Sequence, residues 1–420
     1  MLKSLRKALS IEDIRKRLLY TLAMLIVVRL GSQLPTPGVD PTFIQNFFAQ
    51  QTGDAFNFFE AFTGGSFTRM SVFALSITPY ITSSIIMQLL TIAIPKLEEM
   101  QKDGEDGRKK IAAITRYVTV GLALIESIAM AVGFGRQGLL VKYNFVNAAI
   151  VVLTLTAGSA FLMWIGEQIT ARGVGNGISL IIFAGIVSRL PDGLKIIFQY
   201  LQAGTVNILN VILFAAIALA MVVFVIIISE GIRKIPVQYA KRVVGRKAYG
   251  GHTSYIPLKV NQAGVIPIIF ASSVLMFPVT IAQFVDVPWV KSMGKLFEWG
   301  SPLQTTLYVL MILFFTYFYT AVSLNIGDLS DNIKKNGGFI PGLRPGKPTT
   351  DYLDRVMSRI TLAGAIFLSL IALMPHVIGW ITRIDGIYFG GTALLIVVGV
   401  ALQTMKQIES MVLMRHYHGF

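Results

Sequence analysis

The chain has 420 residues, of which 54% are hydrophobic and only 14% are charged. Soluble domains usually have about 45–50% apolar and about 25% charged residues, so this composition excludes an ordinary soluble domain and indicates an integral membrane protein. The net charge of +15 must then be concentrated in the connections between apolar segments. Because the chain has no cysteine, disulfides, thiolate metal sites and a cysteine nucleophile are also excluded.

Ten segments are long and apolar enough for a helix to cross the bilayer. A spanning helix needs ~20 mostly apolar residues, because the hydrocarbon core is ~30 Å thick. The basic stretch before the first segment is similar to the start of a secretory signal, but no small-residue cleavage site follows, so we interpret that segment as a retained span. The predicted spans cover residues 18–34, 71–94, 114–134, 148–168, 174–190, 206–229, 260–281, 304–325, 360–380 and 387–405.

The positions of the basic residues predict the orientation of these spans. Most of the 37 lysines and arginines lie in the two terminal segments and in alternate connections. Because positive flanks are retained on the inner side, we expect both termini to be cytoplasmic. Two of the inward connections, about 230–259 and 325–359, are longer than is needed to connect neighbouring helices. Such long connections are typical of functional loops. Simple retention with attraction to anionic lipid is the alternative explanation for their charge.

The second and seventh spans share a local pattern that indicates an internal repeat. Pro79 is followed by the pair Ser83 and Ser84, and Pro267 is followed by Ser272 and Ser273. Proline kinks a helix, so we expect interrupted helices in both places. Each span is second in a set of five, and because five is odd, a tandem copy enters the membrane in the opposite direction. The sequence therefore predicts an all-α membrane protein of two inverted five-helix halves, residues 1–190 and 191–420, with a pathway between them.

Few residues in the chain are suited to catalysis or cofactor binding. The four histidines have no metal-binding spacing, and the stretch from Gly342 to Thr349 lacks the glycine spacing of a phosphate loop. The glycines from Gly173 to Gly177 follow no strand, so we interpret them as a tight turn between helices rather than a dinucleotide site. Glu126 lies within the third predicted span, and it is the residue on which an alternative function, a secondary transporter with inverted repeats, would depend.

The segment between Phe58 and Arg69 is apolar but too short and too rich in glycine to cross the membrane. Two interpretations remain open from the residues alone. The segment is either a re-entrant piece on the outer side, or an outer loop that lies on the lipid surface through its phenylalanines.

Five motifs in order along the whole chain resemble the SecY family, which forms the channel of the general protein-translocation complex. The motifs are GSQLPTPG at 31–38, FALSITPYI at 73–81, RGVGNGIS at 172–179, LKVNQAGVIP at 258–267 and PGLRPG at 341–346. The resemblance implies ten transmembrane helices in two inverted halves around an hourglass pore, with a plug and a lateral gate. The implied function is the passage of unfolded secretory proteins across the bacterial plasma membrane and the lateral release of membrane-protein segments into lipid.

The resemblance also implies roles for particular residues. The pore ring would be seven isoleucines: Ile77, Ile81, Ile178, Ile182, Ile266, Ile269 and Ile396. The plug, at about residues 58–71, would include Phe62, Thr63, Gly64, Gly65, Ser66, Phe67 and Arg69. The lateral gate, between the second and seventh spans, would include Thr82, Gln88, Asn261 and Phe277. Docking of a motor ATPase or a ribosome would use Arg242, Arg246, Lys247 and Arg344.

The implied partners are the small SecE and SecG subunits, the SecA motor ATPase, the ribosome, signal sequences, nascent or unfolded polypeptides and membrane lipid. No cofactor, no enzymatic activity and no nucleic-acid substrate are implied. A ring of isoleucine suits this function, because it offers a passing polypeptide no hydrogen bonds and is costly for ions to enter. The serine pairs after Pro79 and Pro267 would let the two gate helices meet closely and separate again. A transporter would instead need a polar site at the midplane, so the sequence favours the channel.

Overall fold

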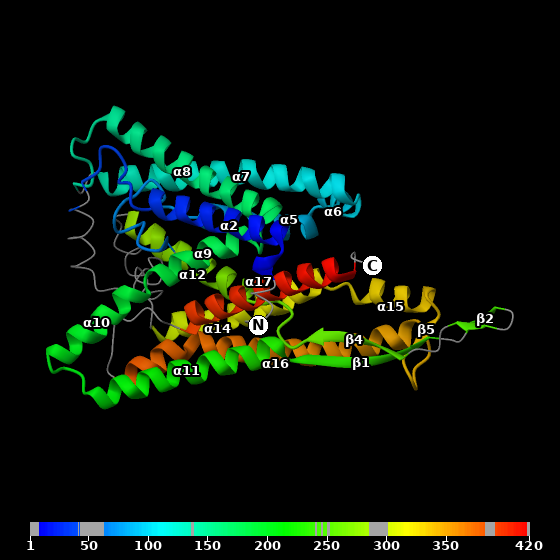
Figure 1. Ribbon diagram of the computed structural model, residues 1–420. Helices are drawn as coiled ribbons and strands as arrows, with labels where there is room; N and C mark the ends of the chain where they lie inside the picture. Colours follow the sequence, from blue (N-terminus) through cyan, green and yellow to red (C-terminus); the bar gives the residue numbers. More distant parts are fainter. Residues whose placement is uncertain are drawn as a thin grey trace.

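The computed structural model describes residues 8–40, 42, 63–135, 138–239, 242–244, 247–249, 253–284, 301–382 and 391–417. They form a bundle of helices from one end of which a β-hairpin projects (Figure 1). Up to residue 202 the helices are α2 Glu12–Gly31, α5 Thr78–Ala93, α6 Pro95–Lys102, α7 Glu105–Gly133, α8 Phe145–Arg172, α9 Gly177–Ser188 and α10 Leu190–Gln202.

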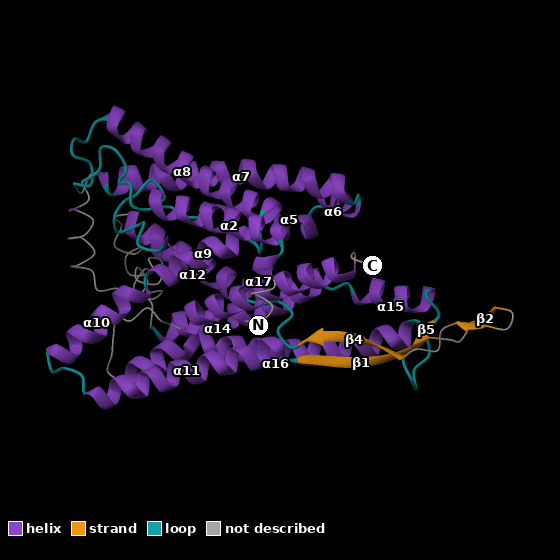
Figure 2. Ribbon diagram, in the orientation of Figure 1, coloured by secondary structure: helices purple, strands orange, loops and turns teal. Residues whose placement is uncertain are grey.

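The rest of the chain contains helices and five short strands (Figure 2). The helices are α11 Ile208–Glu230, α12 Ile266–Phe284, α14 Pro302–Ser323, α15 Ile326–Lys335, α16 Lys347–Thr382 and α17 Gly391–Tyr417. The strands are β1 Ile232–Tyr239, β2 Arg242–Val244, β3 Lys247–Tyr249, β4 Thr253–Lys259 and β5 Gly338–Phe339.

A helix occurs at each of the ten predicted spans, and the mainly helical, membrane-spanning character of the chain is confirmed. Within the described residues, six helices are long and apolar enough to cross a membrane alone: α7, α8, α11, α14, α16 and α17. A seventh span results if α5 and α6, which are bent by 100° at their break, are taken together. The helix α9 has only 12 residues, which rise about 18 Å. The number of ten crossings therefore stays a prediction.

The two prolines of the repeat begin helices and do not kink them. Pro79 is the second residue of α5, and Pro267 is the second residue of α12. At these positions proline fits well, because its missing N–H has no partner to lose and its fixed φ suits the first turn. Residues 71–77, which we expected to be helical, form consecutive turns in which Ser76 has a φ of 52°. The prediction of kinks at these two prolines was therefore wrong.

The same order of packing occurs in the two parts of the chain. The helix α5 packs against α7 and α7 against α8, and in the second part α12 packs against α14 and α14 against α16. Two helices of the second part contact the first among the described residues: α12 lies against α5 and α7, and α17 lies against α2 and α9. This repeated order is what two copies of one five-helix unit would produce, which fits the predicted halves.

The two long basic connections form one folded unit, which we call the basic module (residues 232–239, 253–259 and 324–360). Strand β1 pairs antiparallel with β4, and β5 from the second connection extends the sheet through the pairs Gln238↔Phe339 and Tyr239↔Gly338. Alternate residues of β1, Ile235 and Val237, point into a shared apolar core, as the period of a strand requires. The other buried members of that core are Leu258, Ile333, Ile340, Leu353 and Met357. We predicted two separate loops, and the apolar core and β5 join them.

Candidate functional site

Six of the seven predicted ring isoleucines lie in one apolar cluster between the two parts of the chain. The fully buried members, with 1–3% of their surface exposed, are Ile77, Ile182 and Ile396, and those packed against them with partial burial are Ile81, Ile178 and Ile269. They come from the turn before α5 and from α5, α9, α12 and α17. Ile266 packs in the neighbouring cluster, which Ile81 also joins. The arrangement is an apolar cluster to which both parts contribute.

The turn between α8 and α9 positions two of these isoleucines. The Asn176 side chain accepts a hydrogen bond from the Ser179 N–H at 3.2 Å and so caps α9, which carries Ile178 and Ile182 four residues apart on one face. Gly175 lies in the left-handed region with a φ of 87°, and its N–H donates to Gln407 Oε1 of α17 at 3.0 Å. The turn that we predicted from the glycines therefore also joins the two parts of the chain.

The described part of the predicted plug, residues 63–71, packs inside the bundle at the end opposite the β1–β4 hairpin, and we call it the plug segment. Phe67 has 7% of its surface exposed, and with Met70 it belongs to an apolar cluster that includes residues of α7 and α8. A loop lying on lipid through its phenylalanines would leave this side chain exposed, so that alternative is wrong for Phe67. Phe62 lies outside the described residues.

Two glycines let the plug segment approach its neighbours closely. Gly64 and Gly65 have φ angles of 64° and 82°, which favour glycine. A Cβ on Gly64 would lie 2.8 Å from both Gly185 Cα of α9 and a guanidinium nitrogen of Arg29 on α2. That guanidinium donates a hydrogen bond to the Gly64 carbonyl at 3.1 Å. The main chain of the plug is thus held directly by a side chain of the first helix.

A small cavity of about 20 Å³ separates the plug residues from the ring cluster. This volume is enough for about one water molecule. Its lining includes both hydroxyl groups and apolar side chains of the ring cluster. The lining residues are Val28, Arg29, Ser32, Thr63, Ser66, Phe73, Ser76, Leu162, Ile181 and Gly185.

We predict that Arg29→Met releases the plug segment. A hydrogen bond from a charged donor contributes about 1.5–3 kcal/mol, so its loss should raise the population of the released segment by roughly tenfold or more. Ser66 is 2% exposed, and a cysteine placed there would be the sole thiol of the chain. The rate at which a membrane-impermeant maleimide labels Ser66→Cys in sealed vesicles should rise in proportion.

Arg69→Met is the matched control for this experiment. Arg69 also contacts its neighbours through a guanidinium hydrogen bond, to Gln33 Oε1, but that contact is exposed. Exposed charged contacts contribute little, so the labelling rate should stay within about twofold of the parent. Equal labelling rates in Arg29→Met and the parent would contradict the assigned role of Arg29.

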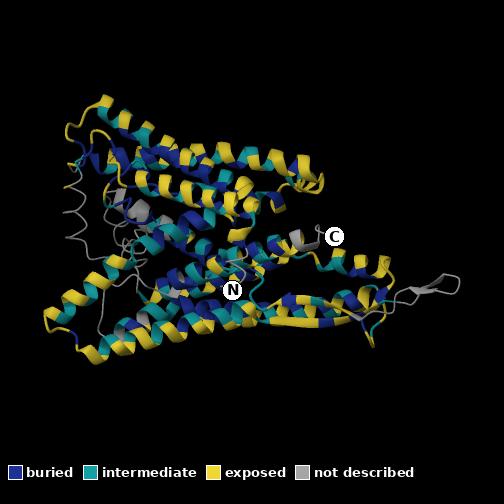
Figure 3. Ribbon diagram, in the orientation of Figure 1, coloured by how far each residue is buried: buried dark blue, intermediate teal, exposed yellow. Residues whose placement is uncertain are grey.

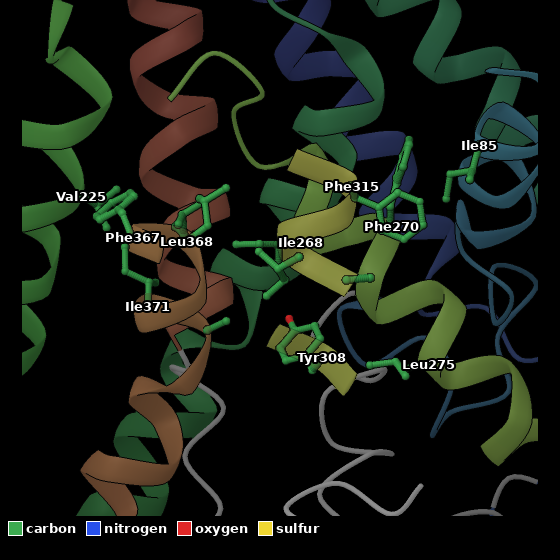
Figure 4. Close-up of a cluster of buried hydrophobic side chains, with 14 residues drawn as sticks. Ile85, Val225, Ile268, Phe270, Leu275, Tyr308, Phe315, Phe367, Leu368 and Ile371 are labelled. Carbon is green, nitrogen blue, oxygen red and sulfur yellow. The ribbon is translucent and has the colours of Figure 1, made fainter. Parts of the chain in front are cut away.

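The contact between α5 and α12, where we expect the lateral gate, is apolar. Ile85 of α5 lies in one buried cluster with Ile268, Phe270 and Leu275 of α12 (Figure 4). Among the side chains that the structure describes, no hydrogen bond joins these two helices. Ser83, which we placed at the gate, points instead to α7, where its hydroxyl bonds the Thr119 hydroxyl at 2.5 Å. In a membrane a hydroxyl gains most from a partner on a neighbouring helix, and α7 provides one.

Two of the predicted gate residues carry buried polar atoms without partners. Gln88 Oε1 and Asn261 Oδ1 are both shielded from solvent, and neither has a hydrogen-bond partner within the described residues. A buried acceptor without a partner is unfavourable, so these two amides favour any rearrangement that supplies a donor or water. Thr82 is partly buried on α5, and the side chain of Phe277 lies outside the described residues.

The predicted docking residues lie in or beside the basic module. The Arg344 side chain is exposed, while its carbonyl accepts a hydrogen bond from the Thr349 hydroxyl at 2.9 Å. Its backbone is therefore fixed and its guanidinium is available to a partner. Arg242 and Lys247 lie on the β2–β3 ribbon beyond the end of β1 (Figure 1), and their side chains lie outside the described residues, as does all of Arg246.

Glu126 forms no constellation that a transporter would need. It is partly buried on α7, and no hydrogen bond or ion pair to it is found in the described part of the chain. No group of three potential metal ligands occurs there either. Sequence reasoning gave no role to Arg29 or Gln407. Arg29 could have been singled out because it is a charged residue near the end of a predicted span. Nothing in the sequence indicates that Gln407 contacts Gly175.

Comparisons with known proteins agree with one another. The SecY family model matches residues 71–405. The Protein translocase subunit SecY of Halalkalibacterium halodurans is 46% identical over 431 residues, covering 100% of both chains. The subunit of the same name from Escherichia coli K12 is 43% identical over 415 residues, covering 97% of this chain and 94% of that protein.

Solved structures share the fold. "The structure of a protein conducting channel" matches with a TM-score of 0.66 and 18% identity, covering 94% of this chain and 91% of that one. "Sec61 in the Canine ribosome-channel complex from the endoplasmic reticulum" matches with a TM-score of 0.61 and 17% identity over the same shares of both chains.

Proposed function

Because this chain belongs to the SecY family, we propose that it is the central subunit of a protein translocase and forms its protein-conducting channel. It is a channel subunit and not an enzyme, and the family sets aside the secondary transporter considered above. We propose that the substrates are unfolded secretory proteins, which cross the bacterial plasma membrane, and membrane-protein segments, which leave sideways into lipid.

The apolar cluster of ring isoleucines carries this proposal. Six isoleucines from five segments pack together between the two parts of the chain. An apolar constriction binds a passing polypeptide weakly, because it offers no hydrogen bonds, and a dry constriction opposes the entry of ions. The side chains are held by packing alone, so they can part when a polypeptide enters and close again behind it.

The proposal extends to the whole architecture. Ten spans in two inverted halves, residues 1–190 and 191–420, would enclose an hourglass pore with both termini cytoplasmic. Support comes from the helix at each predicted span and from the repeated packing order. The plug at about residues 58–71 would close the pore from outside, supported by the burial of Phe67 inside the bundle and by the cavity that Ser66 shares with residues of the ring cluster. The gate would open between α5 and α12.

We propose that the basic module is the docking surface for the SecA motor ATPase or the ribosome, and that SecE and SecG complete the membrane complex. The exposed Arg344 on a fixed backbone supports this role, because a positioned guanidinium is well suited to a carboxylate or a phosphate. One structural neighbour is named as a channel bound to a ribosome.

A cross-linking experiment tests the channel itself. A photoreactive amino acid at Ile81 or Ile269 should cross-link to a secretory chain stalled in transit, because both side chains would line its path. The matched control is Ile125 on α7, which is 65% exposed on the outside of the bundle and should give no cross-link. Equal cross-linking at Ile125 and at the two ring positions would argue that the polypeptide does not pass through the cluster.

A further inference from the structure

The helix α10 is the segment that links the two parts of the chain, and the channel function gives it no role. Its 13 residues rise about 20 Å, which is too short to cross the bilayer. It follows α9 and precedes α11, and it runs obliquely away from the bundle at the end opposite the β1–β4 hairpin (Figure 1). A helix in this place must lie near the surface of the membrane.

The sequence of α10 is amphipathic with the period of a helix. Five of its apolar residues, Leu190, Leu194, Ile197, Phe198 and Leu201, follow the spacing i, i+4, i+7, i+8 and i+11, which places them along one face, while Ile196 lies off it. The polar residues of the opposite face are Asp192, Lys195, Gln199 and Gln202. This pattern is typical of a helix that lies in the plane of a membrane interface.

Within the described part of the chain, the apolar face of α10 is left partly or largely uncovered. No residue of α10 is buried, and Leu194 and Phe198 have 66% and 60% of their surface exposed. Figure 3 shows the helix in the colours of exposed and intermediate residues along its whole length. A helix that packed on a protein surface would bury this stripe, and no segment among the described residues buries Leu194 or Phe198.

The exposed face of α10 is continuous with the lipid-facing surface of α11. The helix α11 begins after a short turn in which Gly204 has a φ of 66°, and its first residues Ile208 and Leu209 are both 71% exposed. Because α11 is the most apolar of the candidate spans, these side chains must face acyl chains. The exposed face of α10 adjoins them along the chain, so the same lipid can cover both.

One ion pair joins the first turn of α10 to the residue at the end of α9, and a second lies within α10. The Asp192 carboxylate lies 3.9 Å from the Arg189 guanidinium and 3.6 Å from the Lys195 ammonium group. Arg189 is also the residue whose guanidinium lies 3.3 Å from the site of a Cβ on Gly65. One end of α10 is therefore fixed beside the plug segment, and the apolar stripe extends away from it.

We propose that α10 is an interfacial helix, embedded at the boundary between headgroups and acyl chains in the leaflet opposite the basic module. Leu194 and Phe198 enter the acyl region, and Lys195 and Gln199 stay in water. Lipid therefore holds the segment that links the two parts. The inference goes beyond the channel function and needs only that the neighbouring helices cross the membrane.

Nitroxide accessibility measures this arrangement directly. Because the chain has no cysteine, single cysteines at Leu194, Lys195, Phe198 and Gln199 can be labelled one at a time in the full chain, with its partner subunits, in phosphatidylethanolamine and phosphatidylglycerol vesicles. The ratio of collision with oxygen to collision with a water-soluble nickel chelate should be at least about threefold higher at Leu194 and Phe198 than at the two polar positions. Ile212 on α11 serves as the lipid reference and the exposed Lys335 on α15 as the water reference.

Two results would overturn the proposal. If the labels at all four positions collided equally and often with the nickel chelate, α10 would lie in water. If the labels at Leu194 and Phe198 collided rarely with both oxygen and the nickel chelate, a protein would cover the stripe. A second measurement guards against perturbation by the label: tryptophan at Phe198 should be quenched by lipids brominated on their acyl chains, and tryptophan at Gln199 should not. The channel function is assayed separately, so its failure would leave these results intact.

Discussion

Replacing Arg344 by glutamate is expected to abolish motor-driven export while leaving the chain folded and inserted in the membrane. The side chain is exposed and has no hydrogen bond or ion pair within the described residues, so the fold does not depend on it. Reversing a charge at a docking contact places like charges together, which costs several kcal/mol, so the rate of ATP-dependent export into reconstituted vesicles should fall by more than about tenfold.

Two variants serve as controls for Arg344→Glu. Arg344→Lys keeps the charge but loses the planar, two-pronged donor and should retain part of the export rate. Lys335→Glu makes the same change of charge at another exposed position of the basic module and should have a much smaller effect. Export at the parent rate by Arg344→Glu would remove this residue from the docking surface.

The second large effect is expected at the apolar constriction. The double substitution of Ile81 and Ile269 by serine should raise ion leak through resting channels by at least about tenfold, because hydroxyl groups hydrate a constriction that is otherwise dry. Both side chains are only partly buried, so the loss of packing should be smaller than at the fully buried Ile182. Conductance in planar bilayers measures the leak.

The matched control for this leak is Ile26→Ser with Ile125→Ser. These isoleucines are 60% and 65% exposed on the outer surfaces of α2 and α7, so the same chemistry is introduced away from the constriction. No increase in conductance is expected. If the ring variant conducted no more than this control, Ile81 and Ile269 would not belong to the seal.

Hydropathy and motifs were enough to predict where the helices lie and which family the chain resembles. The local backbone conformation depends on tertiary contacts, which a sequence pattern does not show. Residues 71–77 are as apolar as the helix that follows, and they form turns because α8 approaches their backbone. A Cβ on Gly158 would lie only 2.0 Å from the Val72 carbonyl oxygen. The proline signal in the second span was real, but it marked the start of α5 rather than a kink.

The candidate site was predictable where it depended on position along a helix and unpredictable where it depended on contacts distant in sequence. The isoleucines that the resemblance assigns to the ring could be named from the sequence, and six of them lie in one apolar cluster, although their role as a ring stays a prediction. The role of Ser83 could not, because the direction of its side chain depends on Thr119, which is 36 residues away. The hydrogen bond between Arg29 and Gly64 and the pairing of β1 with β5 could not be predicted either, because they also join residues distant in sequence.

The contrast between two contacts of α5 explains why a gate should open on one side of this helix. Toward α7 it has the hydroxyl pair Ser83 and Thr119, and toward α12 the described contact is apolar. Lipid tails can replace apolar contacts at little cost, whereas a hydroxyl parted from its partner in hydrocarbon has no substitute. Separation is therefore easier between α5 and α12.

The length of α16 gives the basic module a mechanical connection to the interior. This helix has 36 residues, about 54 Å, and runs from the module to the far end of the bundle, with Pro375 inside its last part. Leu353 anchors it in the core of the module, and Gly364 lies so close to the chain that a Cβ there would be 2.6 Å from the Val260 carbonyl oxygen, just before Asn261. The core of the module is therefore connected through α16 to the turn at residues 260–265, which leads into α12.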